Sequence, residues 1–150
     1  MMLVQFRLAW LKAGTSPSKG FKILPAGALF KEYTDRISKY IPCEIIGMHK
    51  ETKKLSGVFR WICDLRGKPV SSDTLANQIQ TLMDRGSRQL EIWIGGPDGF
   101  SDEEILALKP DFKWSFGPLT YPHELAAAVA SEQIYRALTI HRKMPYHLGH

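Results

Sequence analysis

Short apolar stretches alternate along this chain with longer segments of helical periodicity, and this alternation limits the possible folds more than any other feature. The apolar stretches that we interpret as strands are residues 3–11, 43–48, 58–65, 90–94 and 112–116. Several of them are continuously apolar, which is typical of strands covered on both faces. We therefore expect an α/β fold with a parallel sheet covered by helices on both faces.

Helices are expected over residues 28–40, from Ser71 or Ser72 through Arg85, from Ser101 onward, and over residues 122–143. A turn at residues 66–69 is expected to end the third strand. Only about ten residues connect the second strand to the third, which is close to the minimum for a parallel crossover. These two strands are therefore non-adjacent, antiparallel, or joined by a single turn.

The size and composition favour one cytoplasmic domain that spans residues 1–150. Apolar residues make up 44% of the chain and charged residues 23%, as is ordinary for a globular protein. We expect no membrane segment and no secretion signal, because no apolar run approaches the roughly 20 residues of a membrane span. Cys43 and Cys63 form no C-x-x-C motif, so we expect reduced, buried thiols.

The charge is unevenly distributed between the two halves of the chain. Residues 1–70 hold 13 Lys and Arg against 5 Asp and Glu, whereas residues 71–150 hold 7 against 10. A basic half beside a slightly acidic one is compatible with a surface that faces a polyanion such as RNA. An ordinary solvated lysine-rich face explains it equally well.

Two loops rich in glycine and proline, residues 94–99 and 116–123, each follow an apolar strand and precede a helix. Ligands of open α/β sheets bind at the carboxyl ends of strands, where glycine lets a backbone approach closely. Either loop alone is an ordinary turn more often than a site. There is no G-x-G-x-x-G motif and no phosphate-binding loop, and three acidic residues follow the first glycine loop, so phosphate is disfavoured there.

Several segments together resemble the RlmH family of SPOUT-class methyltransferases, which methylate N3 of a pseudouridine in large-subunit ribosomal RNA. The segments are residues 90–99, residues 116–123, Glu132-Gln133-Ile134-Tyr135-Arg136-Ala137 and Pro145-Tyr146-His147. The segment Asp64-Leu65-Arg66-Gly67-Lys68 resembles the family's acidic-x-x-Gly-Lys turn, and Tyr33 with Arg36 resembles its Tyr-x-x-Arg pattern. The match covers residues 60–147 well and residues 3–48 loosely.

The resemblance implies a C-terminal trefoil knot, an S-adenosylmethionine cofactor, a ribosomal RNA or assembled ribosome as partner, and a homodimer. The implied cofactor contacts are Cys63, Gly95, Phe116, Gly117, Pro118, Leu119, Thr120 and Tyr121. His147, Tyr146 and His123 are the catalytic candidates, because removing the N3 proton calls for a base. Lys12, Lys53, Lys54, Arg60 and Lys68 are expected to contact phosphates.

The chain also departs from the family pattern. The family usually has a longer segment, with a helix, where this chain has residues 50–57, and Ala127 stands where many members have arginine. Gly117 and Pro118 replace the more usual residues of the cofactor loop. The alternatives are therefore a non-catalytic RNA- or ribosome-binding knotted protein with a vestigial pocket and, more distantly, an unrelated nucleotide-binding protein. No metal site is expected from the spacing of His, Cys, Asp and Glu.

Overall fold

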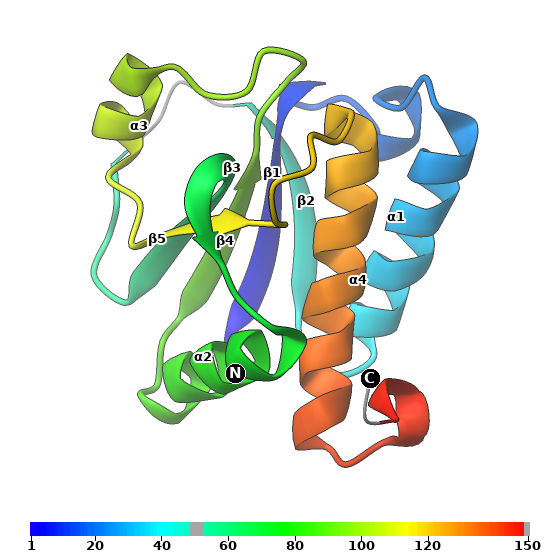
Figure 1. Cartoon of the computed structure of the whole chain (residues 1–150), viewed down its shortest axis with the longest axis vertical. Coiled ribbons are helices and arrows are strands. Elements are labelled where there is room, and N and C mark those ends of the chain that lie inside the picture. Colours follow the sequence, from blue (N-terminus) through cyan, green and yellow to red (C-terminus); the bar gives the residue numbers. More distant parts are fainter. Residues whose placement is uncertain (49–52, 149–150) are drawn as a thin grey trace.

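The computed structural model describes residues 1–48 and 53–148, in which the chain forms a parallel sheet packed against helices (Figure 1). The strands are β1 (Leu3–Lys12), β2 (Cys43–Met48), β3 (Val58–Pro69), β4 (Gln89–Ile94) and β5 (Phe112–Ser115). The helices are α1 (Leu24–Ser38), α2 (Ser72–Asp84), α3 (Asp102–Leu108) and α4 (His123–His141), with short 3-10 helices η1 (Pro17–Lys19) and η2 (Pro145–His147).

The sheet has the strand order β2-β1-β4-β3-β5, and every neighbouring pair is parallel, which confirms the predicted α/β fold. The short connection between β2 and β3 is explained by the first of the three expected possibilities. The two strands are non-adjacent, since β1 and β4 lie between them. Part of that connection, residues 49–52, lies outside the described residues.

The prediction that a turn at residues 66–69 ends the third strand is wrong. Strand β3 continues to Pro69, and both Cys63 and Lys68 pair with Trp114 of β5, so the intervening residues 64–67 form a bulge. A Cβ atom on Gly67 would lie 2.5 Å from the carbonyl oxygen of Lys113. Glycine at this position therefore lets the two strands come together again beyond the bulge.

Helix ends follow local hydrogen bonding and differ slightly from the sequence pattern. Helix α1 begins at Leu24, earlier than expected, because Pro25 is well tolerated in a first turn. The side chain of Ser71 caps α2 by accepting from the backbone N of Thr74 at 3.1 Å. Ser101 and Glu104 form a reciprocal capping box at the start of α3. Helix α4 begins at His123 rather than at Pro122.

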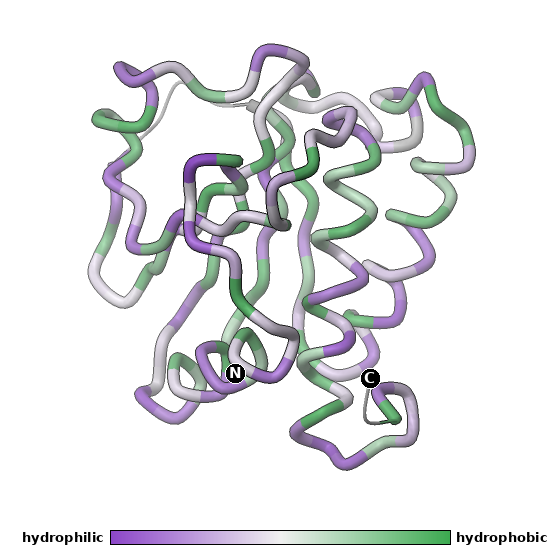
Figure 2. Tube along the Cα trace, viewed as in Figure 1, coloured by the Kyte–Doolittle hydropathy of each residue, from purple (hydrophilic) through white to green (hydrophobic). Residues whose placement is uncertain are grey.

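The two faces of the sheet are covered unequally. One face packs against α1, α2 and α4, where buried residues such as Phe6, Phe30, Ile79, Ile92 and Ile134 form the main core. Apolar residues run along the central strands and recur along α4 (Figure 2). The opposite face carries a smaller cluster in which Phe100 and Leu108, beside α3, pack against the sheet.

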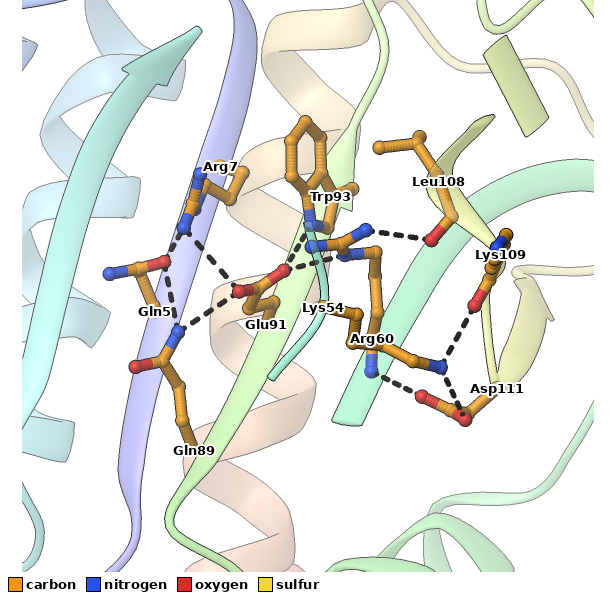
Figure 3. Close-up of polar contacts among 10 residues, drawn as sticks. All are labelled: Gln5, Arg7, Lys54, Arg60, Gln89, Glu91, Trp93, Leu108, Lys109 and Asp111. Atoms are coloured by element: carbon orange, nitrogen blue, oxygen red, sulfur yellow. Dashed lines mark hydrogen bonds and ion pairs between the residues drawn. The ribbon is translucent and has the colours of Figure 1, made fainter. Parts of the chain in front are cut away.

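Beside this smaller cluster, the opposite face of the sheet carries a buried charge network (Figure 3). The Arg60 Nε donates to the carboxylate of Glu91 at 2.7 Å, and both side chains are almost fully buried. The same carboxylate accepts from Trp93 Nε1 at 2.8 Å, from Gln89 Nε2 at 3.0 Å and from Arg7 at 3.4 Å. This many donors offset the cost of burying the charge of Glu91.

Cys43 and Cys63 are both free thiols, as expected, but both residues are only partly buried. Within the described ranges, no helix is both long enough and apolar enough to cross a membrane.

Candidate functional site

A cavity of about 420 Å³ lies at the carboxyl ends of β4 and β5 and beside the bulge of β3. Residues 63–65 form its first wall, residues 94–99 the second, and residues of the 114–123 segment the third, while Ala126 of α4 closes one side. The volume is in the range of small-molecule sites. Three segments that the sequence marks separately are thus brought together around one pocket, which we call the strand-end pocket; two of them are strand ends, and the third is the bulge of β3.

The second wall depends on close contact between backbone segments. A Cβ atom on Gly95 would lie 2.9 Å from the carbonyl carbon of Gly99 and 3.0 Å from its Cα. The backbone N of Gly99 donates to the carbonyl oxygen of Gly96 at 2.9 Å, and Gly99 itself has a φ of +69°. This wall therefore presents backbone groups and little side-chain bulk to a ligand.

The third wall is shaped by a serine and by stacked aromatic rings. The Ser115 hydroxyl accepts from the backbone N of Gly117 and donates to the carbonyl oxygen of the same residue, both at 3.1 Å. The ring of Phe116 packs edge-on against Trp114, with ring centroids 4.8 Å apart, and against Tyr121 at 6.1 Å. These contacts hold the wall in one shape and give the pocket an apolar side.

The charges at the strand-end pocket are acidic. Asp64 and Asp98 line it, and no lysine or arginine is among the described residues that do. Partial burial raises the pKa of Asp64, but hydrogen bonds from Arg66 and the Arg66 charge outweigh this effect and hold the pKa below its ordinary value. Burial, together with Asp64, raises the pKa of the Cys63 thiol, so this thiol is neutral at pH 7.

Most of the residues proposed to hold a cofactor line this one pocket. They are Cys63, Gly95, Phe116, Leu119, Thr120 and Tyr121, and the catalytic candidate His123 lines it as well. Gly117 and Pro118 do not line it. Gly117 faces a different depression, together with residues of α2 and α4, where its φ of +99° lets the third wall turn.

His123 lies at the start of α4 beside residues that the sequence pattern did not single out. Its ring packs edge-on against Trp10, with centroids 4.6 Å apart, and Trp10 Nε1 donates to the carbonyl oxygen of Gly20 at 2.8 Å. Its Nε2 lies 3.6 Å from the buried carboxylate of Glu124. Trp10 lies within the apolar strand β1, so apolar patterning alone assigns it to the core.

The other two catalytic candidates, Tyr146 and His147, lie away from the strand-end pocket. The Tyr146 hydroxyl donates to Glu132 at 2.7 Å and lies 3.2 Å from the Tyr33 hydroxyl. Arg136 lies 4.9 Å from the Tyr146 ring centroid and 2.9 Å from the Nδ1 of His147. We call these five residues the tail cluster.

Burial, followed by the hydrogen bonds to Tyr33 and Glu132, raises the pKa of Tyr146 above its ordinary value. The raised pKa keeps the Tyr146 hydroxyl a hydrogen-bond donor at neutral pH.

Helix α4 separates the strand-end pocket from the tail cluster. His123 is the first residue of α4, and Glu132 follows nine residues later (132 − 123 = 9). At 1.5 Å per residue, this spacing corresponds to about 13 Å along the helix axis. One chain therefore does not bring His147 together with the pocket.

The expected phosphate contact of Arg60 is wrong, because this side chain is buried in the charge network of the sheet. Lys54 Nζ donates to Asp111 at 2.8 Å and to the carbonyl oxygen of Lys109 at 3.0 Å. Lys12, Lys53 and Lys68 are exposed and remain predicted phosphate contacts. In the described part of the chain, no group of three His, Cys, Asp or Glu residues is arranged to hold a metal.

Comparison with known proteins connects this geometry to a family. A family model described as "Predicted SPOUT methyltransferase" matches residues 22–147. A protein of Psychrobacter sp. strain PRwf-1, named Ribosomal RNA large subunit methyltransferase H, is 44% identical over 89 residues, covering 59% of this chain and 53% of that protein. A protein of the same name from Bartonella henselae is 34% identical over 145 residues, covering 80% of this chain and 88% of that protein.

In the best-scoring of these alignments, the chain spans about half the length of the curated relatives it matches. Among solved structures, a probable methylase family protein from Haemophilus influenzae Rd KW20 superimposes with a TM-score of 0.52 at 12% identity, covering 97% of this chain and 68% of that one. This likeness supports the fold, and the sequence matches confirm the resemblance to the RlmH relatives. Because the family model matches most of its length, the chain belongs to the SPOUT methyltransferase family.

Proposed function

We propose that the chain is an S-adenosylmethionine-dependent methyltransferase that acts on N3 of a pseudouridine in large-subunit ribosomal RNA. The strand-end pocket is the observation that carries the proposal. Its glycine-rich walls expose backbone groups. Its charged side chains are the carboxylates of Asp64 and Asp98, and no lysine or arginine is among the described residues that line it. This lining suits a cationic sulfonium ligand better than a phosphate, which weighs against an unrelated nucleotide-binding protein.

The residues present fit such a cofactor, which supplies an electrophilic methyl group when bound. Backbone N–H and C=O groups at Gly95 and along residues 119–121 would hold the edge of the adenine, as backbone groups do in many nucleoside pockets. Phe116 and Leu119 would cover its faces, and Asp64 and Asp98 would favour its positive charge. Alignment of the methyl group with the nucleophile can supply up to about 7–11 kcal/mol of the barrier reduction.

Proton removal from N3 is assigned to His147 or His123, and Tyr146 is assigned to stack on a base. Because His147 lies away from the pocket of its own chain, we propose a homodimer in which the tail cluster of one copy lies near the strand-end pocket of the other. The same family-based proposal includes a C-terminal trefoil knot and a cytoplasmic location beside ribosomes. Lys12 and Lys68, both exposed, would contact RNA phosphates.

The experiment that tests the proposal measures transfer of label from S-adenosylmethionine to ribosomes that lack the modification. We expect label in the large-subunit RNA, located at a pseudouridine by nuclease mapping. Calorimetry with the same cofactor provides the binding control, and absence of binding at millimolar concentration would contradict the proposal.

The alternative is a non-catalytic RNA- or ribosome-binding knotted protein with a vestigial pocket. The departures from the family pattern favour it, since Ala127, where many members have arginine, is fully buried in α4 and leaves no room for a longer side chain. Under this alternative the protein binds ribosomes but transfers no label. Co-sedimentation with ribosomes, run beside the label-transfer assay, distinguishes the two functions.

A further inference from the structure

The side chain of Arg66 connects two walls of the strand-end pocket from outside. It lies on the bulge of β3, and 55% of it is exposed. Its Nε and Nη2 donate to the two carboxylate oxygens of Asp64 at 3.0 and 2.9 Å. Its Nη1 donates to Asp102 at 2.8 Å, and its Nη2 also donates to the carbonyl oxygen of Phe100 at 3.1 Å. One guanidinium therefore holds the first wall and the residues that directly follow the second wall.

The second wall has few other attachments. Its glycines offer no side chains for packing, and beyond them the chain is anchored by Phe100, which is buried with Ile62 and Trp93. Helix α3 follows, and its last residue is held by a second arginine of β3, since Arg60 Nη1 donates to the carbonyl oxygen of Leu108 at 2.7 Å. Arg60 is buried, whereas Arg66 is largely exposed. Of the two arginine contacts, the one made by Arg66 lies next to the pocket, and its exposed side chain is free to adjust its geometry.

We propose that Arg66 is a positioning residue that holds the first and second walls at the spacing the methyl donor requires. This inference rests on the proposed function, because it takes the donor as the ligand of the pocket. Arg66 itself does not line the pocket, so it acts through Asp64 and through the segment at Phe100 and Asp102. Exposed ion pairs contribute little to folding, so the main effect of Arg66 is on donor affinity.

The test compares dissociation constants for S-adenosylmethionine, measured by calorimetry on the full chain. Arg66→Met should weaken binding roughly three- to tenfold while the melting temperature stays near that of the wild type. Arg66→Lys should restore part of the affinity, because an ammonium keeps the charge but not the planar set of donors. Arg85→Met is the matched control, since Arg85 packs over the ring of Phe59 and does not line the pocket.

A double-mutant cycle separates positioning from general destabilisation. Asp102 does not line the pocket, so Asp102→Asn should weaken donor binding in the wild type but have no further effect in the Arg66→Met background. Unchanged affinity of Arg66→Met, or additive effects of the two substitutions, would overturn the inference alone. Absence of donor binding by the wild type would overturn the proposed function and this inference together.

Discussion

The strand-end pocket and the tail cluster lie along the same helix but are built from different groups. The pocket is formed by glycines, backbone groups and aromatic rings at the ends of β4 and β5 and at the bulge of β3. The tail cluster is formed by ionisable side chains that bond to one another across α1, α4 and η2. The pocket thus offers shape and backbone groups, whereas the tail cluster offers ionisable groups.

In the proposed site, the strand-end pocket that would bind the cofactor and the tail cluster that would handle the proton are therefore separate within one chain. The pocket lies at the first residues of α4. The tail cluster includes Glu132, at the midpoint of this helix, and Arg136, one turn later. Joining them requires a second copy of the chain, as we propose.

The largest effect is expected from mixing two inactive variants. His147→Ala removes the proposed base, and Gly95→Ala distorts the pocket, so each alone should lower label transfer at least about 100-fold. If the tail acts on the pocket of the other copy, mixed dimers have one intact site. An equal mixture, refolded together, should then recover about a quarter of the wild-type rate in the label-transfer assay.

Each variant mixed with itself serves as the control for that experiment. His147→Ala should also keep wild-type affinity for S-adenosylmethionine, since His147 does not line the pocket. A mixture as inactive as its components would show that tail and pocket do not combine between copies.

A medium effect is expected on stability at the pocket end. A Cβ atom on Gly95 meets the backbone of Gly99 at 2.9 Å, so Gly95→Ala should destabilise the fold by about 1–3 kcal/mol. A Cβ atom on Gly96 would meet nothing nearer than the Trp10 Cβ at 3.9 Å. The free energy of unfolding of Gly96→Ala should therefore remain within about 0.5 kcal/mol of the wild-type value. Urea unfolding of both variants checks the difference, and equal stability would show that the second wall tolerates a side chain.

The smallest effect is expected at the tail cluster, and it depends on pH. Because folding raises the pKa of Tyr146, the stabilisation by its hydroxyl is complete below the unfolded value, about pH 10, and is lost as pH rises through the folded value. The free energy of unfolding of the wild type should exceed that of Tyr146→Phe by about 1–2 kcal/mol at pH 7, and this difference should decrease above pH 10. Urea unfolding from pH 7 to 11 measures it, with Tyr40→Phe as the control for other tyrosines. A constant difference across this range would contradict the assignment.

Much of the fold could be predicted because local rules decide it. Continuous apolar runs mark the central strands, and Ser71 and Ser101 mark helix starts through their capping bonds. The bulge in β3 could not be predicted, since it depends on Trp114 pairing with β3 on both sides of residues 64–67. Pairing of residues about fifty positions apart leaves no local pattern.

The candidate site divides in the same way. Glycines at strand ends identified the pocket, because parallel strands bring their carboxyl ends to one edge. The positions of Arg60 and of Tyr146 with His147 could not be predicted, since each is decided by distant partners, namely Glu91 for the first and Tyr33, Glu132 and Arg136 for the others. A basic or aromatic residue has the same local signature whether it faces RNA or a buried carboxylate.

The Arg60–Glu91 pair has a consequence for how the strands align. The two residues are paired directly across β3 and β4. If β3 slipped by one residue, Arg60 would turn toward the apolar side of the sheet and Glu91 would lose its main partner. Leaving such charges buried and unpaired costs about 3–5 kcal/mol. The pair thus acts as a built-in check on strand alignment, and it keeps Cys63, where the bulge of β3 begins, beside Ile94, the last residue of β4.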